Sequence, residues 1–354
     1  MRFEKSADGK ALRPCKPLPH EDLEHVLRHT RELWSEAKGA SFFITGGTGF
    51  FGMWLLESFA HINDALGLGM SATVLTRDPE RFRTKAPHLA NRSDLKFVRG
   101  DVRNFEFPEG AFEYVIHGAT TSGGPVEPLE MLETIIDGTR RTLDFAGAHG
   151  TRKFLFLSSG AVYGRQPPEL SHIPEDFPGG PDPLDPNSAY GEGKRAGELL
   201  CVLKARAAGF EVKIARCFAF LGPHLPLDAH FAAGNFIRDA IAGGLIVVKG
   251  DGKSVRSYLY ASDLAVWLWT ILFKGKASEA YNVGSDEALS VAELAWSIGD
   301  ITRLAVDITG SNPCGKAGSY VPSVALASQT LGLRQCVITR KAVERSILFA
   351  SSIQ

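Results

Sequence analysis

The sequence predicts an α/β fold in which a doubly wound parallel sheet is followed by a smaller α+β lobe. After Gly39, short apolar runs alternate with longer segments of helical periodicity, which is the pattern of right-handed βαβ units. Beyond about Phe218 this alternation weakens, and segments rich in glycine and proline become frequent. A chain of 354 residues is long enough for both parts.

The elements follow one another in a regular order. Ahead of the sheet, Leu23, Val26, Leu27, Leu33 and Trp34 recur at helical spacing, so an amphipathic helix should begin near residue 20 and pack as a strap; a partner-binding helix is the alternative. Residues 1–19 are polar and are expected to form a loose arm. Strands are predicted at 41–45, 72–76, 95–98, 114–117, 153–157 and 212–215, with helices at 50–66, 127–149 and 188–208. The lobe should contain an apolar run at 245–248 and helices at 236–242, 261–273 and 290–298.

The composition excludes several classes of function. The net charge is -1 and 44% of residues are hydrophobic, which favours a soluble protein that binds neither nucleic acid nor a membrane. Five cysteines are scattered without a CxxC pair, so we predict free thiols and no metal site. The charged N-terminus lacks the apolar run of a signal peptide, so we expect a cytoplasmic protein.

A glycine-rich loop follows the first predicted strand. Residues 45–52 read TGGTGFFG and open the first helix of the sheet, which is the context that a dinucleotide-binding fingerprint requires. Gly47, Gly49 and Gly52 satisfy G-x-G-x-x-G, while Gly46 and Gly49 would let the backbone turn and approach a pyrophosphate at the helix N-terminus. This loop predicts a Rossmann-type domain that binds NAD or NADP.

The ends of the next two strands bear on the choice of cofactor. Arg77 stands where an acidic residue would indicate NAD, so NADP is slightly favoured. Asp78 follows and can equally cap the next helix. After the third strand, Asp101 is either a contact to adenine or a turn residue.

A tyrosine and a lysine lie four residues apart in NSAYGEGKR. Tyr190 and Lys194 should share one face of a helix, where the ammonium group would lower the pKa of the phenol toward the range of a useful acid or base. Ser158 and Ser159 end the fifth strand, at the edge of the sheet where ligands bind in open α/β folds. Gly191 and Gly193 interrupt the helix, and we expect them to leave room for cofactor or substrate beside Tyr190.

The ordered series TGGTGFFG, SSGAVYG, YGEGK, RCFAFLGP, RSYLYASDLA and YNVGSDEALS resembles the extended short-chain dehydrogenase/reductase family, in particular its NAD-dependent epimerase/dehydratase group. The resemblance covers roughly residues 40 to 350. It implies a Rossmann domain, a lobe that binds a nucleotide sugar, and a homodimer joined through two helices of each subunit. By motif position, Tyr190 is the acid/base, Lys194 its partner and Ser159, rather than Ser158, the catalytic hydroxyl.

These expectations define a candidate site. We divide the chain into an arm with its helix (1–39), an NAD(P)-binding domain (40–217) and a substrate lobe (218–354), and the chain may cross between the last two. Arg256 resembles an arginine that contacts the substrate pyrophosphate; Asn235 is a possible nucleotide contact, and Ser122 a possible sugar contact. The cofactor should contact Gly46, Thr48, Gly49, Phe50, Phe51, Gly52, Arg77, Asp101, Val102, Ala119, Tyr190 and Lys194.

Departures from the family pattern bear on the reaction. Members that catalyse 4,6-dehydration or decarboxylation typically carry an acidic residue within two positions of the catalytic hydroxyl, where this chain has Gly160 and Ala161. Ala219 and Ile135 replace two asparagines of the pattern. We therefore predict a nucleotide-sugar epimerase or 4-ketoreductase acting at sugar C4, with a dehydratase or decarboxylase, or a non-catalytic dinucleotide sensor, as alternatives.

Overall fold

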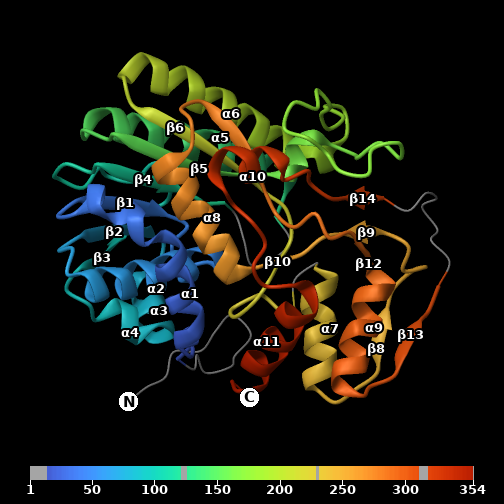
Figure 1. Ribbon diagram of the computed structural model, residues 1–354. Coiled ribbons are helices and arrows are strands. Elements are labelled where there is room, and N and C mark those ends of the chain that lie inside the picture. Colours follow the sequence, from blue (N-terminus) through green and yellow to red (C-terminus); the bar gives the residue numbers. More distant parts are fainter. Residues whose placement is uncertain (1–13, 121–125, 229–230, 311–317, 354) are drawn as a thin grey trace.

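A parallel sheet of seven strands forms the centre of the computed structural model, which describes residues 14–120, 126–228, 231–310 and 318–353 (Figure 1). The strand order is β3-β2-β1-β4-β5-β6-β11, and every pairing in this sheet is parallel. The predicted α/β, Rossmann-type class is confirmed. The strands are β1 (Ser41–Thr45), β2 (Ser71–Thr76), β3 (Leu95–Arg99), β4 (Tyr114–His117), β5 (Lys153–Ser159), β6 (Glu211–Cys217) and β11 (Glu279–Val283).

Helices cover both faces of this sheet. α5 (Pro128–Ala148) and α6 (Ala189–Ala208) lie side by side on one face, and α2 (Phe50–Leu66) and α8 (Ala261–Lys274) lie on the other (Figure 1). Because successive residues of a strand point to opposite faces, Phe43 and Ile44 of β1 belong to different hydrophobic cores. The short helices α3 (Pro79–Lys85) and α4 (Pro87–Ala90) join β2 to β3.

The N-terminal segment is packed onto the α8 side. α1 (His20–Thr30) continues into a 3-10 helix, η1 (Arg31–Ala37), and both pack on α8, with Trp34 in edge contact with Trp269 at 4.8 Å. The predicted helix therefore packs on the fold, as expected of a strap. The loose arm is a wrong prediction for residues 14–19: Cys15 N donates to Lys85 O at 2.6 Å, and Leu18 N donates to the Glu57 carboxylate at 2.7 Å. Residues 1–13 lie outside the described part of the chain.

The smaller lobe combines helices with short strands. Its helices α7 (Ala232–Ile241), α9 (Val291–Thr302) and α11 (Thr339–Ser351) pack on one another. β8 (Ile246–Val248) pairs with β13 (Val306–Ile308), β7 (Phe220–Leu221) with β10 (Leu259–Tyr260), and β9 (Val255–Arg256) with both β12 (Leu289–Ser290) and β14 (Ser319–Tyr320). α10 (Ala325–Leu331) lies between β14 and α11 in the chain.

The chain crosses between the two parts. The helix predicted at 261–273 forms as α8, but it covers the large sheet rather than lying in the lobe, and β11 then adds a seventh strand beside β6. Its 14 residues include 13 buried ones, because a helix between the sheet and α1 is covered all round. Within the described residues, no helix has both the length and the apolar character needed to cross a membrane.

Candidate active site

The glycine loop lies at the point where the strand order reverses. β1 is flanked by β2 and β4, so the loops after β1 and β4 diverge at one edge of the sheet, which is where open α/β sheets bind ligands. Gly46 adopts a left-handed conformation (φ +75°), and a Cβ there would lie 2.5 Å from the carbonyl carbon of Gly118, just beyond β4. Only glycine permits this turn at this approach.

The other glycines of the loop have separate roles. A Cβ on Gly52 would lie 2.2 Å from the backbone of Gly47, so α2 can dock against the loop only without a side chain there. Gly49, at the N-cap of α2, is exposed, and a Cβ on it would approach only Gly46 O within 4 Å, at 3.5 Å. The loop is therefore tightly packed on its inner side and open at the helix N-terminus, where backbone N–H groups favour an anion.

Residues around the loop hold this edge in place. The Nζ atom of Lys85 donates to Thr48 O at 3.1 Å, and Phe51 packs edge-on against Phe220 at 5.1 Å, while Phe50 contacts Phe51 at 5.6 Å. Burial lowers the pKa of Lys85. Sequence reasoning did not single out this lysine, because no local motif links it to a loop 37 residues earlier.

A buried histidine joins the ends of β1 and β4 to α5. His117 bonds to Thr45 Oγ1 at 2.7 Å through Nδ1 and to Thr139 Oγ1 at 3.1 Å through Nε2. Burial, with the nearby Lys194 ammonium, lowers the pKa of His117 to about 3, so the ring is neutral. Thr45 Oγ1 also accepts from Ala119 N at 3.2 Å, which positions the loop that carries Ala119.

The ends of β2 and β3 carry three of the predicted cofactor residues. Arg77 is exposed, and Thr76 pairs with Arg99, so two guanidinium groups lie on adjacent strand ends. Asp78 caps α3 by accepting from Arg81 N at 3.1 Å, as its alternative role predicted. Val102 is 8% exposed and packs closely against Gly138 of α5, because a Cβ on Gly138 would lie 2.7 Å from the Val102 side chain.

Asp101 is occupied within its own turn. Its carboxylate accepts from Arg103 N and Nε, both at 2.9 Å, and from Arg103 Nη2 at 2.8 Å. These bonds hold the pKa of Asp101 below its ordinary value. Of its two predicted roles, the turn role is the one that these contacts show.

The two serines at the end of β5 face different partners. Ser158 donates to the Glu198 carboxylate at 2.5 Å, and Glu198 is in turn held by Arg216 at 2.7 Å. Ser159 instead caps the 3-10 helix η2 (Gly160–Tyr163) by accepting from Ala161 N at 3.1 Å, and its hydroxyl contacts the Tyr190 phenol. Ser159 is therefore the serine that lies beside Tyr190.

Tyr190 and Lys194 lie on one face of α6, as their spacing predicted. Burial raises the pKa of the Tyr190 phenol, and the hydrogen bond with Ser159 opposes that rise. The predicted lowering of this pKa by the Lys194 ammonium is therefore wrong for the structure, because burial outweighs the opposing contacts. The Nζ atom of Lys194 lies 6.0 Å from the centre of the Tyr190 ring and donates to Leu157 O at 2.7 Å. Lys194 is 3% exposed, and burial lowers its pKa to about 8.

The helix glycines leave room for protein rather than for a ligand. A Cβ on Gly191 would lie 2.7 Å from Ala161 O, and one on Gly193 would lie 3.2 Å from the Ile135 side chain. The expectation that these glycines make space for cofactor or substrate is therefore wrong. They let α6 approach η2 and α5 closely, which places Tyr190 next to Ser159.

A second tyrosine completes the site. Tyr320 Oη lies 3.5 Å from both Ser159 Oγ and Cys217 O, and burial raises the pKa of its phenol. The register of β14 against β9 pairs Tyr320 with Arg256, whose guanidinium lies 5.9 Å from the Tyr320 ring centre. Tyr320 was missed because it lies 161 residues from Ser159, in a segment without a recognisable motif.

The predicted substrate residues are less closely grouped. Arg256 Nη1 donates to Val255 O at 2.8 Å and to Gly318 O at 2.9 Å, so β9 and β14 support it beside Tyr320. Asn235, on α7, accepts from Arg238 at 3.2 Å. Ser122 lies outside the described residues.

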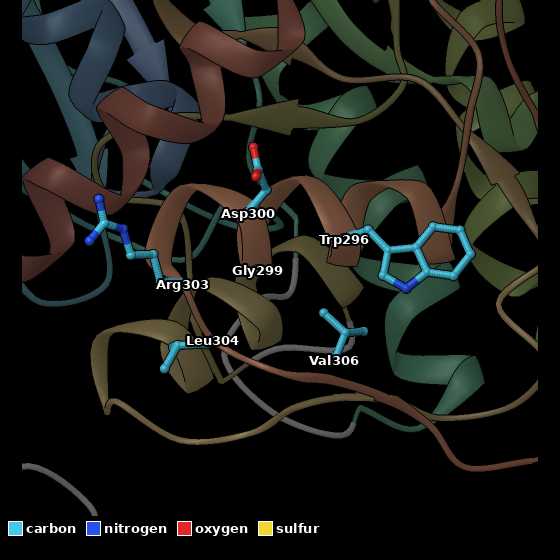
Figure 2. A pocket seen from close by; sticks show the side chains of 6 residues that line it. All are labelled: Trp296, Gly299, Asp300, Arg303, Leu304 and Val306. Atoms are coloured by element: carbon cyan, nitrogen blue, oxygen red, sulfur yellow. The ribbon is translucent and has the colours of Figure 1, made fainter.

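A hollow of about 390 Å³ lies elsewhere, on the small lobe between α9 and β13 (Figure 2). It contains none of the predicted site residues, and we assign it no part in the site. Its lining is Trp296, Gly299, Asp300, Arg303, Leu304 and Val306.

Together, the dinucleotide-type loop and the Ser159, Tyr190 and Lys194 set define the class of short-chain dehydrogenase/reductase proteins with an extended C-terminal lobe. The chain belongs to the NAD dependent epimerase/dehydratase family, whose model matches residues 42–284. The predicted family membership is thus confirmed.

Named relatives are enzymes that act on nucleotide sugars. UDP-glucuronic acid decarboxylase 1 of Xenopus tropicalis is 29% identical over 265 residues, which is 74% of this chain and 60% of that protein. UDP-glucuronic acid decarboxylase 6 of Arabidopsis thaliana is 26% identical over 96% of this chain and 94% of its own length. The UDP-glucuronic acid 4-epimerase of Bacillus cereus, solved with UDP-glucuronic acid and NAD, has the same fold with a TM-score of 0.74 and 21% identity, covering 89% of this chain and all of that one.

Proposed function

We propose that this protein is an NAD(P)-dependent enzyme that oxidises or reduces C4 of a nucleotide sugar. The observation that carries the proposal is the arrangement of Ser159, Tyr190 and Lys194 at the same sheet edge as the glycine loop. Family membership and the named relatives support the nucleotide sugar as substrate.

The chain's own residues fit the cofactor. The open side of Gly49 at the N-terminus of α2 suits a pyrophosphate, and the exposed Arg77 lies at the strand end where an adenosine ribose is read in this fold. When bound, the nicotinamide ring supplies the acceptor and donor of a hydride.

Tyr190 moves the proton in the proposed mechanism. As the phenolate, Tyr190 takes the proton from the C4 hydroxyl during oxidation, and as the phenol it returns that proton during reduction, while the Ser159 hydroxyl hydrogen-bonds the same oxygen. An ammonium group at Lys194 stabilises the phenolate through its charge. In the structure Lys194 Nζ is held by Leu157 O, on the strand that also ends in Ser159.

Two kinds of reaction, with and without loss of carbon, are candidates, and each has its own support. Epimerisation or 4-keto reduction is favoured by Gly160 and Ala161, which provide no carboxyl group next to Ser159. Decarboxylation is favoured by relatives that are UDP-glucuronic acid decarboxylases, and this support is at least as strong. The chain spans only about 60% of the first of these relatives, so we keep both reactions as candidates.

UDP-glucuronic acid separates the two reactions chemically. Oxidation at C4 places a ketone β to the C6 carboxylate; the C5–C6 bond can then break, releasing CO₂ and leaving its electron pair on C5 as an enolate that takes up a proton. A decarboxylase permits that step and then returns the hydride to C4 of the resulting 4-keto-pentose. An epimerase must instead return the hydride to the other face of C4 before carbon is lost.

The test is a product assay with UDP-glucuronic acid and, separately, UDP-glucose, each with NAD and with NADP, read by NMR and by CO₂ release. A C4 epimer without CO₂ shows epimerisation, and a UDP-pentose with CO₂ shows decarboxylation. In a third assay, which supplies a nucleotide 4-keto sugar and NADPH, stoichiometric oxidation of NADPH shows reduction. Cofactor bound without turnover of any nucleotide sugar would contradict the proposal and favour a dinucleotide sensor.

For the cofactor we propose NADP, although the Bacillus cereus epimerase was solved with NAD. The support is the pair of cations, Arg77 and Arg99, on adjacent strand ends, since a guanidinium group binds a 2′-phosphate well. Replacing Arg77 with Asp should weaken NADP binding at least about tenfold and spare NAD. Arg83→Asp, an exposed cation on α3, is the control; equal binding of both cofactors by the unaltered chain would contradict NADP preference.

We also propose a homodimer in the cytoplasm. α6 exposes Leu199 and Leu203, 61% and 57% accessible and one helical turn apart, beside α5. Paired helices of this kind form the dimer interface in the family that the sequence resembles. Four cysteines in the described residues are free thiols, which suits a reducing compartment; cell fractionation tests that location.

A further inference from the structure

Three metal-ligand side chains meet where α1 contacts the loop before α11. His25 and His29 lie one turn apart on α1, and Cys336 belongs to the loop that follows α10. The three side chains offer ligand atoms that all lie within 4.8 Å of one another. None of them belongs to the candidate active site.

The hydrogen bonds of both histidines leave a lone pair for a ligand. His29 Nδ1 lies 2.8 Å from His25 O, and because a carbonyl only accepts, Nδ1 carries the proton and Nε2 is left as the lone-pair nitrogen. His29 Nε2 lies 3.9 Å from Cys336 Sγ. Tetrahedral Zn²⁺ with ordinary bond lengths would separate such a nitrogen and sulfur by about 3.6 Å, so only a small adjustment is needed.

A buried carboxylate orients the cluster. Asp263 of α8, 1% exposed, accepts from His25 Nε2 at 2.8 Å, which leaves the other ring nitrogen of His25 free to bind. Its second oxygen accepts from Cys336 N at 2.8 Å and from Val337 N at 2.9 Å. Metal-binding histidines commonly donate their other N–H to such a carboxylate, and here the same group also positions the loop that carries the thiol.

We propose that His25, His29 and Cys336 bind a divalent transition-metal ion of the Zn²⁺ class, with Asp263 as the positioning residue. Two imidazoles and one thiolate form a ligand set that suits Zn²⁺ and leaves a fourth position for water. Binding displaces the proton of the Cys336 thiol to solvent. The ion would fasten α1 to the loop before α11 and thereby fix the N-terminal strap on the fold.

A neighbouring group, with two residues on α1 and one on α2, is the internal comparison. His20, Glu24 and His61 also lie within 4.8 Å of one another, but this group has no thiol, and His61 Nε2 already lies 2.8 Å from Glu24 Oε1. His20 is exposed, so its substitution tests whether the metal ion binds at this second group instead.

The experiment uses the full chain, stripped with a chelator and titrated with Zn²⁺ against a chromogenic chelator, and with Co²⁺ by absorbance. His29→Ala and Cys336→Ser replace exposed side chains and should fold; circular dichroism checks this. We expect one Zn²⁺ per chain, a Co²⁺ spectrum with a thiolate charge-transfer band, and at least about a tenfold loss of Zn²⁺ affinity in both variants. The controls His20→Ala and Cys15→Ser should bind as the unaltered chain does.

Three results would overturn the proposal. They are unchanged Zn²⁺ affinity in His29→Ala and Cys336→Ser, a Co²⁺ spectrum without the thiolate band, or loss of binding in a control variant instead. Because every readout is metal binding, the outcome does not depend on the reaction proposed for the active site.

Discussion

Tyr190 and Lys194 lie one helical turn apart on the same face of α6, and burial shifts the pKa of both side chains. It raises the pKa of the phenol and lowers that of the ammonium, so each group is shifted toward its neutral form. The bond from Ser159 partly offsets the shift at Tyr190. The pair is therefore sensitive to any charge that a bound ligand brings.

Replacing Tyr190 with Phe removes the proton carrier while preserving the ring. Turnover of the nucleotide sugar should fall by about 10²–10⁴-fold, while the affinity for NADP, measured by fluorescence titration, should stay within a factor of two or so. Phe177→Leu, which alters an aromatic residue near Tyr163, is a control for general perturbation. Retained turnover in Tyr190→Phe would remove this residue from the mechanism.

Lys194→Met tests the cost of burying the ammonium. The pKa of Lys194 is about 8 in the folded chain against an ordinary value of 10.5, so the unfolded chain binds more protons between these two values and stability should rise with pH across that window. Below pH 8 the charged form carries the full cost, about 3 kcal/mol at 1.36 kcal/mol for each pH unit. Lys194→Met should be more stable by up to about 3 kcal/mol at pH 7, and the difference should shrink by pH 10.

Urea unfolding of the two proteins at both pH values measures this difference. Comparing variants at each pH cancels the titration of all other groups. An equal gap at pH 7 and pH 10 would show that Lys194 is not destabilised by burial. The variant should also lose turnover, because the cation beside Tyr190 is gone.

At the scale of elements, the glycines of α6 are explained by the segments that pack against this helix. The sequence indicated that Gly191 and Gly193 weaken the helix, but it did not identify the residues that lie beside them. Ala161 and Ile135 lie 30 and 58 residues earlier in the chain and reach α6 only through packing. The helix bounds, in contrast, were predicted within a residue, because local periodicity sets them.

Gly191→Ala and Gly193→Ala form a matched pair on this helix. A methyl group at 191 meets the Ala161 backbone oxygen at 2.7 Å, so η2 must shift, and we expect a loss of about 1–3 kcal/mol of stability together with reduced turnover. At 193 the contact is a side chain at 3.2 Å, which can give way, and the gain in helix propensity, up to about 1 kcal/mol, offsets the strain. Denaturant unfolding and initial rates check both; equal effects would argue against close contact between α6 and η2.

For the molecule as a whole, the two parts of the chain are interleaved. α8 and β11 come after the predicted boundary at residue 217 in the chain, yet α8 packs on the large sheet and β11 is one of its strands. The predicted domain limits stay a prediction, and a single cut in the sequence does not separate the two parts. The strands β7, β9 and β14 belong to the smaller lobe. They bring Phe220, Arg256 and Tyr320 of this lobe to the edge of the large sheet that carries the candidate site. A nucleotide sugar between them would contact both parts.

The proposed dimer makes a prediction at this scale. Replacing Leu199 and Leu203 together with Arg should give a monomer in sedimentation velocity, because two buried guanidinium groups without partners oppose association. Leu348→Arg, which alters a 73% exposed leucine on α11, should leave the dimer intact. If the double variant is still a dimer, the interface lies elsewhere. If the unaltered chain is a monomer, the proposed dimer is refuted.

The sequence by itself determined the fold class, the family, the glycine loop and the spacing of Tyr190 and Lys194. These features depend on local periodicity and on motifs whose residues lie within one loop or one helix turn. Only the tertiary structure placed Tyr320 at Ser159, turned Ser158 toward Glu198, inserted β11 into the sheet and brought Cys336 to His25 and His29. Each of these joins residues 40 or more positions apart, and such pairs meet only when hydrophobic burial packs whole elements together.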